Sequence, residues 1–195
     1  MRHKVRMKRN LFSFVYLATV LSLGLGLQGK KGKQKMLFNF AEGENGKSWQ
    51  VVNDGVMGGL SSGVFQIEDQ TGTLSGTLSL ENNGGFSSVR SPVDTYKLGK
   101  YQGFVLRVRG DGRTWSMTLR DTPYFTGLAH NASFDTEAGS WQEIQIAFSD
   151  FEAKYFGRSA RVEPIDPDEI RQMGVILADK KAGPFEIEID WLKVY

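Results

Sequence analysis

The stretch that decides the fold is FVLRVRGDGRTWSMTLR, residues 104–120, which alternates apolar and other side chains on either side of a Gly-Asp-Gly turn. Before the turn, every second residue is apolar, and Arg107 and Arg109 lie on the opposite face. After the turn the same alternation places Arg120 opposite the apolar residues. A period of two is typical of β-strands that bury one face. The stretch therefore predicts a hairpin with one buried face.

The same period extends through the rest of the chain and predicts eight or more strands. Further strand-like segments span residues 64–68, 73–80, 86–91, 144–148, 173–178 and 185–191. In the last of them, the pattern assigns Trp191 to the apolar face. Only residues 166–171, with a capping Asp followed by Pro, predict a helical turn. Strands without intervening long helices predict an all-β fold, an antiparallel β-sandwich of the jelly-roll kind.

A loop of unusual composition, VNDGVMGGLSSG at residues 52–63, precedes the predicted strands. Its four glycines allow left-handed backbone, and its Asn, Asp and Ser side chains bond readily to nearby backbone groups. Two interpretations follow, of which the first is favoured: a loop that Asp54 and its serines bond internally, or a loop that faces a ligand. The candidate binding residues here are Asn53, Asp54, Met57 and Ser61.

Arginines and aromatic residues supply a second candidate surface. The residues concerned are Arg90, Arg107, Arg109, Arg120, Tyr124, Phe125 and Arg158. Arginine and tyrosine are enriched in binding hot spots, so these residues form a candidate binding face if their strands are neighbours. The alternative is a solvated face of cross-strand ion pairs, each of which stabilises little.

Catalytic chemistry has few candidate residues in this chain. There is no cysteine, and His130 is the only histidine apart from His3 near the N-terminus. The acidic residues within 186–190 alternate with apolar ones on the outward face of a strand, where solvated charge is usual. No loop has the Asp-x-Asp-x-Asp pattern of a calcium site. We expect no enzymatic activity, no metal site and no cofactor.

The N-terminus differs from the rest in charge and hydropathy. Five of the 24 Lys and Arg residues precede the first apolar run. The rest of the chain then has 19 Lys and Arg residues against 22 Asp and Glu residues, a net charge of −3. A mildly acidic domain argues against nucleic-acid binding. Residues 1–28 are interpreted as a signal peptide or membrane anchor, 29–36 as a basic linker and 37–195 as the domain. We expect export, periplasmic or secreted, first, membrane anchoring second and mitochondrial import third, with membrane contact only through this segment.

Several motifs in order resemble one family. They are Trp49 with NDGVMGGLS at residues 53–61, GGFSSVRS at 84–91, RVRGDGR at 107–113, FGR at 156–158 and GPF at 183–185. Together they resemble the complex I intermediate-associated protein 30 (CIA30) family, over roughly residues 38–195. The resemblance implies a galactose-binding-like sandwich and an assembly or chaperone role toward a protein partner such as a respiratory-complex subunit.

Two functions from different classes therefore remain. The first is a non-enzymatic binding protein of the assembly-factor type. The alternative is a carbohydrate-binding module of an exported protein, with Trp115, Tyr124 and Phe125 as platforms on which sugars stack.

Overall fold

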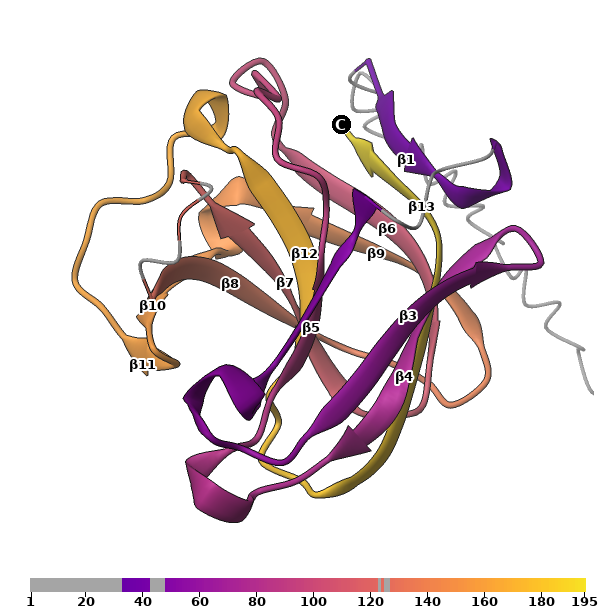
Figure 1. Ribbon diagram of the computed structural model, residues 1–195. Helices are drawn as coiled ribbons and strands as arrows, with labels where there is room; N and C mark the ends of the chain where they lie inside the picture. The colour runs from indigo at the N-terminus through magenta and orange to yellow at the C-terminus, as the bar shows by residue number, and fades with distance from the viewer. Residues whose placement is uncertain (1–32, 43–47, 123, 125–126) are drawn as a thin grey trace, which may run out of the picture. The chain divides into compact units, whose positions relative to one another are not determined.

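Two antiparallel β-sheets pack face to face in the computed structural model, which describes residues 33–42, 48–122, 124 and 127–195 (Figure 1). These residues belong to the compact unit Lys31–Tyr195. The predicted all-β antiparallel sandwich is confirmed. The predicted signal peptide or anchor at residues 1–28 and Phe125 lie outside the described residues.

The first sheet has the strand order β3-β4-β13-β6-β9, and β1 also pairs with β13. Its strands are β1 (Lys35–Asn39), β3 (Ser62–Glu68), β4 (Thr71–Leu78), β6 (Gly103–Gly110), β9 (Trp141–Ala147) and β13 (Gly183–Val194). The second sheet has the order β11-β10-β8-β7-β12-β5-β2. Its strands are β2 (Gln50–Asn53), β5 (Ser87–Arg90), β7 (Thr114–Arg120), β8 (Leu128–Asp135), β10 (Glu152–Tyr155), β11 (Arg158–Ser159) and β12 (Gln172–Leu177).

Helical structure within the described residues is confined to short 3-10 turns. They are η1 (Phe40–Glu42), η3 (Asp54–Met57), η4 (Glu81–Asn83), η5 (Phe148–Asp150) and η6 (Pro167–Glu169). The turn η6 confirms the predicted helix start, because the Asp166 carboxylate accepts a hydrogen bond from the Asp168 N–H at 2.9 Å.

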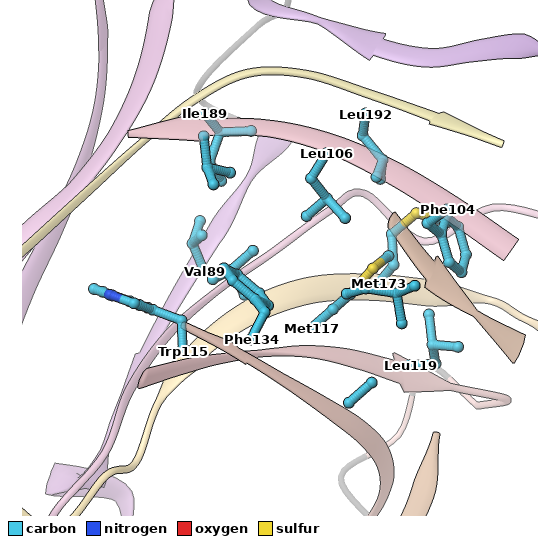
Figure 2. Packing of buried hydrophobic residues seen from close by; sticks show 14 of the residues in the cluster. Val89, Phe104, Leu106, Trp115, Met117, Leu119, Phe134, Met173, Ile189 and Leu192 are labelled. Carbon is cyan, nitrogen blue, oxygen red and sulfur yellow. The ribbon is translucent and has the colours of Figure 1, made fainter. Parts of the chain in front are cut away.

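The core lies between the sheets and consists of the apolar residues that the alternation places inward. Figure 2 shows Leu106, Ile189 and Leu192 of the first sheet facing Met117 and Met173 of the second. All five side chains are at most 5% exposed. Burial of such a side chain stabilises the fold by roughly 1.5–3 kcal/mol, which is why the pattern of period two determines these faces.

The predicted hairpin at residues 104–120 is wrong. Strand β6 pairs with β13 and β9, whereas β7 pairs with β12 and β8, so the turn between them carries the chain from one sheet to the other. At this corner the Asp111 carboxylate accepts hydrogen bonds from the Trp115 Nε1–H at 3.1 Å and the Glu186 N–H at 2.9 Å. The two strands face each other across the core, so the alternation is the same as in a hairpin.

The assignment of Trp191 to the apolar face is also wrong. The register between β13 and β6 shifts between Ile189 and Trp191, which is the sign of a β-bulge. The extra residue, Asp190, leaves Trp191 on the outer face, while Leu192 returns to the core. The Lys193 Nζ lies 3.7 Å from the centroid of the Trp191 ring, a cation–π contact on the surface.

Candidate functional site

Asp54 organises the loop at residues 53–63 from a completely buried position. Its carboxylate accepts hydrogen bonds from the Ser61 N–H at 2.9 Å and the Ser61 hydroxyl at 2.5 Å. It also accepts from the Gly85 N–H at 2.5 Å and the Phe86 N–H at 3.3 Å, on the neighbouring loop. Since four donors occupy this carboxylate, the geometry agrees with the internally bonded loop that the sequence favoured.

The ionisation of Asp54 reflects these donors. Burial raises the pKa of the Asp54 carboxyl, but the hydrogen bonds from Ser61, Gly85 and Phe86 together outweigh burial and leave the pKa below its usual value. The carboxylate is therefore charged at neutral pH and holds the two loops together as an anion.

Backbone conformation and the bonds of Asn53 also help to fix this loop. Gly58 adopts left-handed backbone with a φ of 89°, which a side chain would strain. Asn53 is bonded as well, since its Nδ2 donates to the Gly63 carbonyl at 3.2 Å and its Oδ1 accepts from the Ser87 hydroxyl at 2.7 Å. The candidate residues Asn53, Asp54 and Ser61 are therefore all held in hydrogen bonds within the protein.

The same loop exposes apolar side chains to solvent. Val56 is 63% exposed, Met57 49% and Leu60 56%, and Leu80 on the neighbouring loop is 45% exposed. We call these four residues the apolar loop end. The single-turn coils η3 and η4, purple and magenta at the lower left of Figure 1, mark its two loops. Sequence reasoning selected Met57 but missed Val56, Leu60 and Leu80, whose signal is an apolar residue within a loop rich in glycine and polar residues.

The predicted arginine face divides between the two sheets. Arg107 and Arg109 lie on the outer face of β6, where Arg107 pairs with Asp190 and Arg109 pairs with Glu188. The Arg109 guanidinium donates to both Glu188 oxygens, at 2.8 and 2.6 Å, and these bonds raise the pKa of Arg109. Both guanidiniums also stack on the Trp141 ring, at 4.7 and 5.1 Å from its centroid. This face matches the alternative of paired charges.

Arg90 and Arg120 lie on the outer face of the second sheet instead. Each Nε is buried without a hydrogen-bond partner within the described part of the chain. Arg120 donates from Nη1 to the Leu128 carbonyl at 2.8 Å. Burial, together with the nearby Arg120 charge, lowers the pKa of Arg90 to about 10, and burial also lowers the pKa of Arg120.

The remaining candidates differ in how far solvent reaches them. Tyr124 is 77% exposed, and Arg158 is exposed on the edge strand β11. Trp115 is completely buried, so it is not available to stack on a sugar. His130 is 4% exposed, and its Nε2 lies 3.3 Å from the Glu163 carbonyl oxygen. The aromatic platforms proposed for a carbohydrate therefore do not assemble on one described surface.

No group of three or more His, Cys, Asp or Glu side chains is placed to hold a metal ion among residues 33–42, 48–122, 124 and 127–195. Within the same residues, no helix has the length and apolar character that a membrane crossing requires.

Known proteins resemble this chain in sequence. The complex I intermediate-associated protein 30 of Mus musculus, named mitochondrial, is 31% identical over 83% of this chain and 56% of its own length. The Drosophila melanogaster protein of the same name is 25% identical over 84% of this chain and 63% of its own length. The chain thus spans little more than half the length of these relatives.

Solved structures resemble it in fold. A family 11 carbohydrate-binding module of a Clostridium thermocellum cellulosomal cellulase superposes with a TM-score of 0.64 at 18% identity, covering 83% of this chain and 94% of the module. An agarase superposes with a TM-score of 0.58 at 11% identity over 83% of this chain and 24% of the agarase. At these identities the likeness concerns the β-sandwich alone.

The relatives correct the expected localisation. Export was ranked first because residues 1–28 combine a basic start with an apolar run, and mitochondrial import was ranked third. The relatives from mouse and Drosophila, and two from Caenorhabditis, are all named mitochondrial. These names point to mitochondrial localisation, so the ranking was wrong. A basic and apolar N-terminus did not distinguish the two destinations.

The family match begins on β1 and ends within β13. The family model of complex I intermediate-associated protein 30 matches residues 38–189, which include both clasped loops and nearly all strands of both sheets. This chain therefore belongs to the complex I intermediate-associated protein 30 (CIA30) family.

Proposed function

We propose that this chain is a non-enzymatic protein-binding module that associates with an assembly intermediate of respiratory complex I in a chaperone-like role. Its family and the names of its relatives support this proposal. The arrangement of polar residues is consistent with it: Asp54 and Ser61 are used in holding loops together, and His130 is buried.

The apolar loop end is the observation that carries the proposal. Val56, Met57, Leu60 and Leu80 leave about half or more of each side chain in water. Exposed apolar side chains that gather on a surface mark sites of protein association. Asp54 fixes the loops beneath them, so little conformational entropy is lost when a partner binds. The flexible thioether of Met57 adapts to an uneven apolar partner.

Co-purification tests this surface. Tagged chain is expressed in cells and recovered from their mitochondria, either unchanged or as the triple variant Val56→Ser/Met57→Ser/Leu60→Ser. We expect complex I subunits to co-purify with the unchanged chain and to fall about tenfold or more with the triple variant, since each lost apolar contact weakens binding.

A matched control removes apolar side chains elsewhere. Val93 and Val162 are 46% and 49% exposed on other loops, so Val93→Ser/Val162→Ser changes similar surface away from the apolar loop end. This variant should retain the complex I subunits. Equal recovery with the triple variant and the unchanged chain would contradict the proposed surface.

A further inference from the structure

The outer face of the second sheet carries one row of polar side chains across its strands. The register places Arg90 of β5 opposite Gly174 of β12, and Gly174 opposite Thr118 of β7. Thr118 in turn lies opposite Asn131 of β8. Arg120 lies two pairs further along β7, on the same face, opposite Gln172. These four strands lie side by side in Figure 1, so segments far apart in sequence contribute to one surface.

Gly174 leaves the middle of this row without a side chain. The arginines lie on the strands at either side of β12, and their charges are close enough that Arg120 contributes to the lowered pKa of Arg90. The two arginines therefore lie on the strands that flank β12, and the backbones pack closely between them, because a Cβ at Gly174 would collide with the Val89 carbonyl oxygen.

Among the described residues, no carboxylate forms an ion pair with either of these guanidiniums. Arg90 makes no ion pair or hydrogen bond with any of them, and Arg120 donates only to the Leu128 carbonyl. Of the nearby acidic residues, Asp121 acts on Arg120 only through its charge, and Glu152 is paired with Lys154 at 2.9 Å. The Asn131 Oδ1 is also buried without a donor.

Two neighbouring like charges without counterions lower the stability of a folded protein. A buried charge without a partner loses hydration that nothing restores, and two like charges at close range repel. On the first sheet, by contrast, Arg107 and Arg109 each have a carboxylate. On the second sheet, the Arg90 Nε, the Arg120 Nε and the Asn131 Oδ1 are buried without a hydrogen-bond partner among the described residues.

We propose that the outer face of the second sheet binds a phosphate monoester through Arg90 and Arg120, and that Asn131 accepts a hydrogen bond from a hydroxyl group where the molecule carries one. A phosphate monoester carries nearly two negative charges at neutral pH and matches two guanidiniums, whereas a single carboxylate matches one. The monoester comes either from a small hydroxylated metabolite or from a lipid headgroup. The site is separate from the apolar loop end and does not depend on the proposed protein partner.

Titration calorimetry of the full chain tests this site. The probes are glycerol 3-phosphate, acetate as the monoanion, and vesicles of phosphatidylcholine with and without phosphatidic acid. We expect glycerol 3-phosphate to bind and acetate to bind at least tenfold more weakly. Arg90→Gln and Arg120→Gln should each raise the Kd for glycerol 3-phosphate by about tenfold or more, since each removes charge-assisted hydrogen bonds. Binding to the phosphatidic acid vesicles alone would assign the headgroup as the source.

A control and a stability measurement separate binding from a structural role. Arg158→Gln removes an exposed arginine from another strand and should leave the Kd unchanged. Without phosphate, Arg90→Gln should unfold at the same urea concentration as the unchanged chain or at a higher one, because it removes an unpaired cation. No binding of either phosphate probe, equal weakening by Arg158→Gln, or a clearly lower urea midpoint for Arg90→Gln would each overturn the site.

Discussion

Asp54 shows at the residue scale how a loop of glycines becomes a fixed surface. Both of its oxygens accept hydrogen bonds, from Ser61 in its own loop and from Gly85 and Phe86, which lie 31 and 32 residues further along the chain. We expect Asp54→Asn to lower the free energy of unfolding by about 2–4 kcal/mol, because the amide removes the charge and turns a donor toward other donors. Urea denaturation followed by tryptophan fluorescence measures the change.

A matched substitution shows whether this effect belongs to the buried position. Asp69 is exposed and adopts left-handed backbone, with a φ of 48°, which asparagine tolerates. Asp69→Asn should change the free energy of unfolding by less than about 0.5 kcal/mol. Similar losses for the two variants would contradict the role assigned to Asp54.

The lowered pKa of Asp54 also predicts how stability depends on pH. A carboxyl whose pKa is lower in the folded than in the unfolded chain stabilises the fold above the unfolded value, which is about 3.9. This contribution is complete above about pH 5 and is lost as the pH falls through 3.9 toward the lower folded value. The stability difference between the unchanged chain and Asp54→Asn should therefore shrink between pH 5 and pH 3. A difference that stays constant in urea titrations over this range would exclude an ionised Asp54 as the cause.

At the scale of elements, the corner between β6 and β7 depends on Arg113. Its guanidinium donates to both oxygens of Asp179, at 3.0 and 2.7 Å, and to the carbonyls of Lys181 and Pro184 near the start of β13. The Arg113 and Asp179 side chains are only 12% and 5% exposed. Burial raises the pKa of Asp179, yet the bonds and charges of Arg113 and Lys181 outweigh burial and lower the pKa.

Removal of the Arg113 side chain should therefore lower the stability of the fold. We expect Arg113→Ala to lower the free energy of unfolding by about 3–5 kcal/mol, because it leaves the Asp179 carboxylate buried and unpaired. Arg109→Ala, which breaks a pair whose guanidinium is 40% exposed, should lower it far less than Arg113→Ala does, because solvent screens the exposed pair. Equal urea midpoints for the two variants would show that the corner does not depend on this ion pair.

The strands themselves were predictable from the sequence, but their partners were not. Alternation in residues 104–120 identified which side chains face inward, since burial of apolar surface enforces it in any sheet arrangement. The same alternation fits a hairpin and a corner between sheets, and only the bonds of Asp111 and Arg113 distinguish them. Trp191 was assigned to the wrong face because the alternation of residues 185–191 does not show that a one-residue bulge interrupts the strand.

At the scale of the whole molecule, the separation of the two sheets divides the predicted arginine face. Arg107 and Arg109 on one outer face are paired, whereas Arg90 and Arg120 on the other form no ion pair within the part of the chain that the structure describes. Composition selected the right residue type but not the face, because strand order is a long-range property. The loop at residues 53–63 was recognised, but most of its exposed apolar residues were not. Their exposure depends on the backbone conformation that the hydrogen bonds of Asp54 impose.

Photocrosslinking from defined positions tests the central claim most directly, that the apolar loop end contacts a complex I subunit. p-Benzoylphenylalanine replaces Met57 in one chain and Val93 in another, two exposed apolar sites on different loops. After irradiation of mitochondria, we predict a covalent product with a complex I subunit from position 57 and none from position 93. A product with such a subunit from position 93 alone, or no such product from position 57, would contradict the account.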